Sequence, residues 1–166
     1  MIFATESSLI DFAKSVGQSV LASFATQVFE LVGDVGAGKT TFTRGLALGL
    51  GITEPVTSPS FNISKRYSFA RYASADASSA AHREATPVTQ NELIHYDFYR
   101  LDDPGLMSFE LEEALSEPHA VIVVEWAGSV ADLLPSSRIR IDFRILDDGS
   151  RELTFDGSPT LERKLS

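Results

Sequence analysis

The sequence predicts an α/β protein in which a mixed β-sheet is flanked by helices. Amphipathic stretches, with an apolar residue every three or four positions, intermingle with short runs of branched and aromatic residues. Near the C-terminus, apolar and polar residues alternate strictly, which is typical of an antiparallel hairpin with one solvated face. The length of 166 residues fits a single domain that spans the whole chain.

The first elements expected are a helix over residues 7–21 and a buried strand over residues 27–32. Apolar side chains recur at helical spacing in the helix, and the strand is a short apolar run that ends in glycines. Ser7 or Ser8 is expected to cap the helix, since a hydroxyl accepts a hydrogen bond from an unpaired backbone N–H.

A second helix is expected from residue 39 to residue 50, and Gly51 is placed to end it. Two extended segments, rich in aromatic and branched residues, are expected over residues 61–69 and 93–101. Between them, residues 73–90 contain one valine and no other large apolar residue. Such a segment cannot contribute to a core, so we expect a flexible surface insert there.

A third helix is expected to open at residues 102–104, with Leu106, Phe109, Leu111 and Leu115 forming its apolar face. The run 121–124 is wholly apolar, as in a strand that is covered on both faces. The final hairpin pairs residues 139–145 with residues 152–155.

Composition excludes several classes of protein. There is no cysteine, so disulfides and thiolate metal sites are excluded. The formal net charge of -9 argues against unaided binding to nucleic acid, which depends on Lys and Arg. No apolar stretch approaches the length of a membrane span, and the N-terminus lacks the pattern of a signal peptide. We therefore expect a cytoplasmic protein without membrane contact.

Residues 33–40 match the phosphate-binding pattern G-x-x-x-x-G-K-[ST] in full, between a predicted strand and a predicted helix. In such a loop the backbone N–H groups converge on phosphate oxygens, and the helix N-terminus adds positive potential. Lys39 is expected to reach the β- and γ-phosphates and Thr40 to ligate Mg²⁺. No [NT]-K-x-D element for guanine is present, which favours ATP or ADP. The predicted binding residues are Gly33, Asp34, Val35, Gly36, Ala37, Gly38, Lys39 and Thr40.

Two carboxylates follow predicted strands, where ligands of α/β sheets bind. Glu125 follows the purer apolar run and is expected to bind the metal; Asp97 would orient the attacking water or complete the metal shell. The alternative is that either residue caps a helix or pairs with an arginine such as Arg100. The hydroxyls of Thr57 and Ser58 sense the γ-phosphate in one interpretation, and belong to an ordinary turn in the other.

Taken together, the loop with Thr41, the segment 57–61, the stretch His-Tyr-Asp-Phe-Tyr-Arg-Leu at 95–101 and Val-Glu-Trp at 124–126 resemble the TsaE family. These proteins are small bacterial ATPases of tRNA threonylcarbamoyladenosine biosynthesis. The resemblance extends over roughly residues 5–157.

The resemblance implies a P-loop NTPase-like fold that binds Mg-ATP or Mg-ADP, and an ATPase that supports the TsaB–TsaD pair in modifying the tRNA adenosine beside the anticodon. By motif, Lys39 would hold phosphates, Thr40 and Glu125 the Mg²⁺, and Asp97 would assist hydrolysis. Ser8, Thr41, Thr57 and Ser58 join the implied nucleotide-binding residues. Contact with tRNA is expected to be indirect or weak. Two other classes stay open, a small-molecule kinase and a nucleotide-gated binding module.

Overall fold

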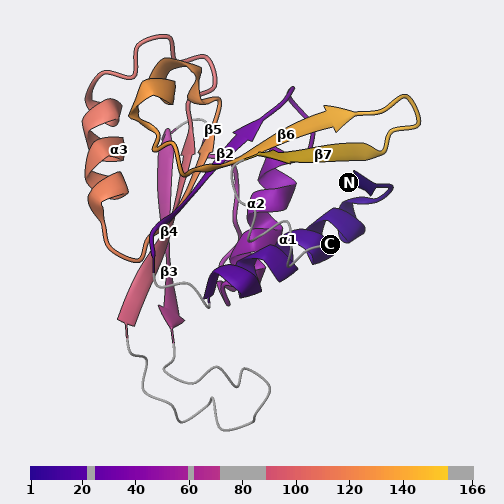
Figure 1. Cartoon of the computed structure of the whole chain (residues 1–166), viewed down its shortest axis with the longest axis horizontal. Coiled ribbons are helices and arrows are strands. Elements are labelled where there is room, and N and C mark those ends of the chain that lie inside the picture. The colour runs from indigo at the N-terminus through magenta and orange to yellow at the C-terminus, as the bar shows by residue number, and fades with distance from the viewer. Residues whose placement is uncertain (22–24, 60–61, 72–88, 157–166) are drawn as a thin grey trace, which may run out of the picture.

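One mixed β-sheet organises the part of the chain that the computed structural model describes, residues 1–21, 25–59, 62–71 and 89–156 (Figure 1). The elements in chain order are β1 (Ile2–Phe3), α1 (Glu6–Leu21), β2 (Gln27–Val32), α2 (Lys39–Gly49), β3 (Ser64–Arg71), β4 (Thr89–Asp97), α3 (Leu106–Ser116), β5 (Val121–Glu125), the 3₁₀ helix η2 (Ala127–Leu133), β6 (Ile139–Ile145) and β7 (Arg151–Asp156). The α/β class is confirmed.

The strands lie in the order β1-β7-β6-β2-β5-β4-β3. The four inner strands are parallel, with β2 paired to both β5 and β6, and β5 paired to β4. Antiparallel partners extend both sides, β3 on β4 and the hairpin β6–β7, which carries β1 at its outer edge. The sheet is therefore mixed and ends in a C-terminal antiparallel hairpin, as the sequence predicts.

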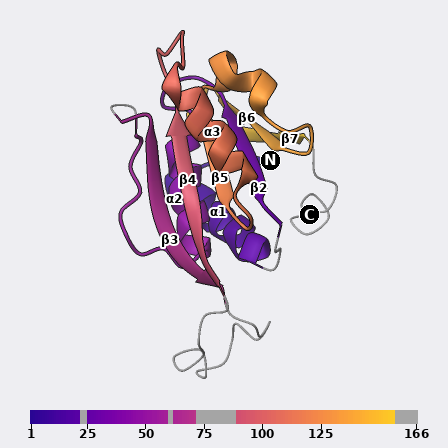
Figure 2. The ribbon, with the colours of Figure 1, turned by 90° about the vertical axis from the view of Figure 1, so that its left-hand side faces the viewer.

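Helices cover both faces of this sheet, and each face has its own apolar core. Helices α1 and α2 lie on one face, while α3 and η2 lie on the other (Figure 2). Alternate residues of β5 supply the two cores: Val121 and Val123 pack toward α1 and α2, and Ile122 and Val124 toward α3. All four are fully buried, which explains the continuous apolar run of this strand.

Helices α1 and α2 approach each other closely because glycines lie at their contact. A Cβ atom at Gly45 would lie 2.6 Å from Ala13 Cβ and 2.6 Å from the carbonyl oxygen of Ile10. The backbone of α1 therefore occupies the space that a side chain at Gly45 would need. This contact holds the middle of α2 against α1.

The start of α1 differs from the prediction. The helix begins at Glu6, and Thr5 caps it in place of Ser7 or Ser8. The Ser8 N–H donates to Thr5 Oγ1 at 3.1 Å, and the Ser8 hydroxyl donates to the Thr5 carbonyl at 2.8 Å. Thr5 and Ser8 are three residues apart, the spacing of a capping box, so Ser8 supports the cap from inside the first turn.

The two extended segments are shifted relative to the prediction. Strand β4 ends at Asp97, four residues early, because Asp97 Oδ1 accepts the Tyr99 N–H at 3.0 Å and turns the chain. It also begins at Thr89, so the last two residues expected in the insert belong to a strand. Residues 73–88 of that insert lie outside the described residues. Strand β3 runs from Ser64 to Arg71.

Helix α3 buries part of the face predicted: Leu111 and Leu115 pack in the core, whereas Leu106 and Phe109 do not. Leu106 is 84% exposed and Phe109 is 64% exposed. The core side is formed by Met107, Leu111, Ala114 and Leu115, at the i, i+4, i+7 and i+8 positions of the helix.

Within the described residues, no helix combines the length and apolar character that a membrane crossing requires.

The glycine contact makes a prediction about stability. Gly45→Ala forces a methyl group against the α1 backbone and is expected to lower the free energy of unfolding by about 1–3 kcal/mol. Gly128→Ala is the matched control, since a Cβ atom there has nothing within 4 Å. Urea unfolding measures both variants. Equal stability of the two variants contradicts the close packing of α1 on α2.

Candidate functional site

The loop between β2 and α2 has the backbone form that its glycines permit. Gly33 and Gly38 have φ angles of 146° and 107°. A Cβ atom at Gly33 would overlap the carbonyl oxygen of Phe143 on β6. No side chain caps the N-terminus of α2, so its first N–H groups are not bound by a capping residue. Such a loop forms a concave set of amide donors suited to an anion.

Lys39, the first residue of α2, turns back toward this loop. Its Nζ donates to the carbonyl oxygens of Gly33, at 2.7 Å, and Asp34, at 2.9 Å, and lies 4.3 Å from the ring centroid of Trp126. Only 4% of the residue is exposed. Burial lowers the pKa of Lys39, and the nearby carboxylates of Glu125, Asp97 and Asp34 oppose that effect. The site thus holds a partly desolvated cation.

Glu125, the last residue of β5, lies beside the start of α2. Its Oε1 accepts a hydrogen bond from Thr40 Oγ1 at 3.2 Å and lies 2.9 Å from His95 Nε2. The register of the sheet places Glu125 between Leu31 of β2 and Asp97 of β4. The parallel pairing therefore brings both predicted carboxylates to the edge of the sheet where the glycine-rich loop begins.

Asp97 connects this edge to the segment that follows α2. Its Oδ2 accepts the Ser58 hydroxyl at 2.5 Å. The same segment is held at two further points: Arg44 Nε donates to the Val56 carbonyl at 3.2 Å, and the Thr57 N–H donates to Tyr67 Oη at 3.4 Å. Ser58 is thus fixed to a carboxylate of the site, whereas Ser60 and Phe61, predicted in the same segment, lie outside the described residues.

The predicted residues Ser8 and Thr41 make their hydrogen bonds to residues at the start of α1. The Thr41 hydroxyl donates to Glu6 Oε1 at 3.4 Å, and Ser8 belongs to the cap of α1 described above. The first turn of α1 therefore borders the glycine-rich loop, and Leu9 Cδ2 lies 3.0 Å from an ideal Cβ position at Gly38. A role of these two hydroxyls in binding a nucleotide stays a prediction.

Two aromatic residues beside the loop, Tyr99 and Trp126, were not among the predicted binding residues. Trp126 directly follows Glu125, has a left-handed φ of 59°, and packs its ring against Tyr99 at 4.9 Å between centroids. The Arg100 guanidinium lies 4.7 Å from the Tyr99 ring and forms no ion pair within the described residues. It is therefore not the partner of either carboxylate. The sequence signal was the position of Trp126 immediately after a predicted ligand.

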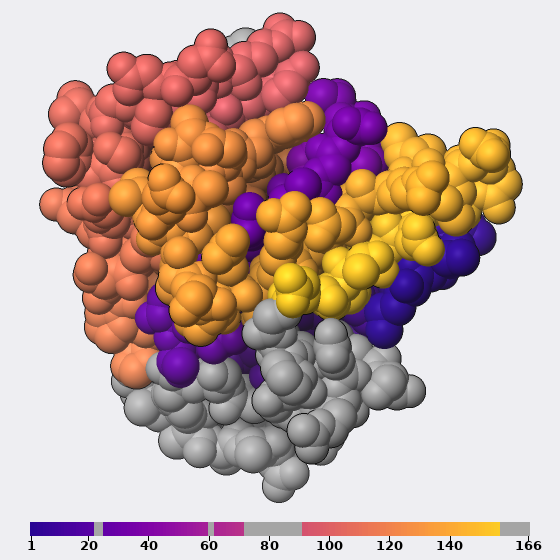
Figure 3. Space-filling model, turned by 45° about the horizontal axis from the view of Figure 1, so that its top comes forward, coloured from indigo at the N-terminus to yellow at the C-terminus, as the bar shows by residue number. Residues whose placement is uncertain are grey.

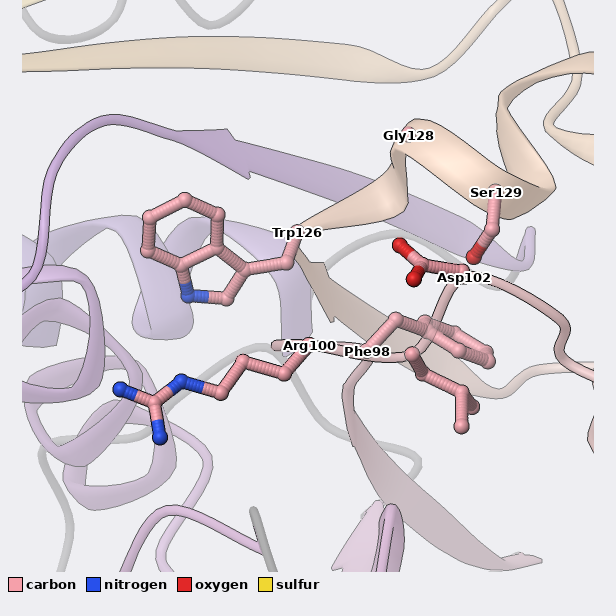
Figure 4. A pocket seen from close by; sticks show the side chains of 7 residues that line it. Phe98, Arg100, Asp102, Trp126, Gly128 and Ser129 are labelled. Carbon is pink, nitrogen blue, oxygen red and sulfur yellow. The ribbon is translucent and has the colours of Figure 1, made fainter.

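Two pockets open beside Trp126. The first, of about 350 Å³, has Trp126 and Arg100 on one side and Asp102 and Ser129 on the other (Figure 4). The second, of about 410 Å³, lies between the end of β2, η2 and Arg140. Figure 3 shows this face, with β2 and the loop after it (violet) lying between the orange η2 segment and the yellow hairpin. The second pocket includes Gly33 and Asp34 of the loop, the first includes no loop residue, and neither includes Lys39.

The donor set fits a magnesium ion that is bound together with a phosphate ligand. No group of three or more His, Cys, Asp or Glu residues is arranged to hold a metal within the described ranges, so this part of the chain forms no all-protein metal cage. Thr40 and Glu125 instead place one hydroxyl and one carboxylate side by side. Mg²⁺ commonly binds through one or two protein oxygens plus phosphates and water.

These features define the class of protein: an α/β protein with a P-loop-like fold, whose glycine-rich loop connects a central parallel strand to a helix. The comparisons with known proteins agree. The family model described as "Threonylcarbamoyl adenosine biosynthesis protein TsaE" matches residues 3–153. The chain therefore belongs to the TsaE family.

Its relatives and a solved structure support this membership. The chain is similar to the tRNA threonylcarbamoyladenosine biosynthesis protein TsaE of Bacillus subtilis, with 38% identity over 136 residues, covering 81% of this chain and 73% of the relative. The protein of the same name from Streptomyces coelicolor is 39% identical over 132 residues, covering 76% and 77%. The crystal structure of Bacillus subtilis YdiB superposes with a TM-score of 0.66 and 29% identity, covering 99% of this chain and 88% of that chain.

The buried ammonium of Lys39 makes a prediction about pH. Because the pKa of Lys39 is lowered in the folded state, the unfolded chain binds more protons as the pH approaches 10.5, and folding becomes more favourable there. The free energy of unfolding of the wild type, relative to Lys39→Met, is therefore expected to rise between pH 7 and pH 10.5. Chemical denaturation of both proteins across this range measures it. If the stability of the wild type relative to Lys39→Met instead falls over this range, the folded site raises the pKa of Lys39, which contradicts the prediction.

Proposed function

We propose that this chain takes part in tRNA threonylcarbamoyladenosine biosynthesis as a Mg²⁺-dependent ATPase that supports the TsaB–TsaD pair. One observation carries the proposal: Lys39, Thr40, Asp97 and Glu125 lie together at the edge of the sheet where the glycine-rich loop begins. Membership of the TsaE family supports the biological role, because the curated relatives carry that name.

The loop binds the phosphates in this proposal. Its amides and the N-terminus of α2 supply donors, and Lys39 supplies the charge. In the structure, Lys39 Nζ donates to two carbonyls of its own loop. A phosphate oxygen is a stronger acceptor for an ammonium than a carbonyl, since it carries a formal charge. The ammonium is thus held next to the loop and exchanges loop carbonyls for phosphate when the nucleotide binds.

Thr40 and Glu125 would hold the magnesium ion. The ion neutralises the charge that develops on the phosphates. Glu125 is 3% exposed, and a carboxylate in such a dry environment interacts more strongly with a cation than one in water. Adenine nucleotide remains the expected ligand, because the sequence has no [NT]-K-x-D element for reading guanine.

Asp97 is proposed to orient the attacking water. Its carboxylate is 4% exposed and lies on the strand next to Glu125. Its hydrogen bond to Ser58 connects it to the segment that follows α2. If the Ser58 hydroxyl exchanges Asp97 for a phosphate when nucleotide binds, the conformation of the segment after α2 would depend on the nucleotide state, as in switch segments.

Slow turnover by the isolated protein is part of the proposal. Within the described residues, the arginine nearest in sequence to Asp97 is Arg100, which stacks on Tyr99 and is exposed. A partner surface that orders such a cation would accelerate hydrolysis, as supplied arginines do in other P-loop enzymes. The net charge of -9 favours action on a protein complex with at most indirect contact with tRNA.

The test is ATP turnover with and without purified TsaB–TsaD. Wild-type protein is expected to release phosphate slowly, and faster when the pair is added. Lys39→Ala and Glu125→Gln are expected to lower kcat/KM by about 100-fold or more, because each removes charge or a ligand at the transferring phosphate. Lys14→Ala, which removes an exposed lysine of α1, is the matched control and is expected to behave as wild type.

Three outcomes contradict the proposal. Unchanged turnover in Lys39→Ala removes the case for this site. Transfer of the labelled phosphate to a metabolite indicates a kinase. Nucleotide binding with no phosphate release, with or without the pair, indicates a nucleotide-gated binding module.

A further inference from the structure

We infer that His95 is a positioning residue for Glu125: its Nε2–H holds one oxygen of the carboxylate and leaves the other for the cation that accompanies the nucleotide. The inference rests on the proposed function and adds to that site a buried residue outside the glycine-rich loop.

His95 reaches Glu125 from the neighbouring strand. It lies two residues before Asp97 on the same face of β4 and is paired with Val123, so Glu125 is its diagonal neighbour on β5. Long side chains can meet across such a diagonal. The distance from His95 Nε2 to Glu125 Oε1 is 2.9 Å, with His95 fully buried and Glu125 3% exposed.

The direction of this hydrogen bond follows from the chemistry of the two groups. An ionised carboxylate only accepts hydrogen bonds, so Nε2 carries the hydrogen, and in the neutral ring Nδ1 is then an acceptor. Nδ1 is buried and has no hydrogen-bond partner in the described part of the chain. Burying a polar atom in this way lowers stability. A leucine, as at Leu93 two residues earlier on the same face, would avoid that loss, so the contact with Glu125 is what a histidine adds here.

The contact decides what Glu125 can bind. Glu125 Oε1 accepts hydrogen bonds from both Thr40 and His95, whereas Oε2 accepts none from a described residue. The competing partner is the ammonium of Lys39, which lies within electrostatic reach of Glu125. With Oε1 held by two donors, the carboxylate stays apart from Lys39, which donates to its own loop. His95 thereby keeps the cation ligand and the phosphate ligand separate.

Two variants of equal side-chain length separate positioning from packing. His95→Gln keeps an N–H donor near the position of Nε2, and His95→Met has no donor. Calorimetry would measure the affinity for ATP with Mg²⁺ and with EDTA in each protein. We expect similar affinities in EDTA for all three proteins. The gain in affinity that Mg²⁺ provides is expected to persist in His95→Gln and to fall about tenfold or more in His95→Met, as for other residues that orient a metal ligand.

The outcomes distinguish this inference from the proposed function. A full Mg²⁺ gain in His95→Met overturns the inference alone. Equal losses in His95→Gln and His95→Met also overturn it, because they indicate packing. Failure of the wild type to bind ATP overturns the proposed function together with the inference.

A second measurement needs no variant at His95. The chain has three histidines, so the ¹⁵N spectrum of histidine-labelled wild type contains few signals. His82→Ala and His119→Ala identify the remaining signal as His95. A ring that carries a proton on Nε2 supports the inference, and a neutral ring with its only ring N–H on Nδ1 overturns it, since Nε2 would then have no hydrogen to donate to Glu125.

Discussion

The parallel pairing of β2, β5 and β4 is the constraint on which the site depends. Because the three strands run in one direction, their carboxyl ends meet at one edge of the sheet. The glycine-rich loop leaves β2 at this edge, and Glu125 and Asp97 end the neighbouring strands. Helix α2, packed closely on α1, begins with Lys39 and Thr40, which lie beside the two carboxylates. The antiparallel strands at both sides of the sheet contribute none of these side chains.

This arrangement buries charge that an ordinary core would not contain. Lys39, Asp97 and Glu125 are each 4% exposed or less. Desolvation destabilises each of them, and their mutual attraction and hydrogen bonds offset part of that loss. A dry site also strengthens the interaction with an incoming charged ligand. The buried charges therefore make this part of the molecule locally unstable, and binding of a phosphate and its cation would relieve that instability. The backbone of Trp126, which lies next to Lys39, has a left-handed conformation, and this strain agrees with a functional site.

The sequence predicted the parts of the molecule that contiguous patterns encode. The glycine-rich loop is one uninterrupted motif, and Asp97 and Glu125 each follow an apolar run, so the rule for the ends of parallel strands brought them together correctly. The contacts of His95 with Glu125 and of Ser58 with Asp97 join segments that are 30 and 39 residues apart, and only the register of the sheet creates them. The buried face of α3 was predicted only in part for a related reason: Leu111 and Leu115 do pack in the core, but packing selected Met107 and Ala114 in place of Leu106 and Phe109.

The central claim is that this edge binds a nucleotide through Lys39 with a cation at Thr40 and Glu125. A crystal structure with Mg²⁺ and a non-hydrolysable ATP analogue tests it most directly. The account predicts phosphate oxygens within hydrogen-bond distance of Lys39 Nζ and the loop amides, with the metal contacting the Thr40 hydroxyl. An analogue bound in one of the pockets beside Trp126, with Lys39 still donating to the carbonyls of Gly33 and Asp34, would contradict it.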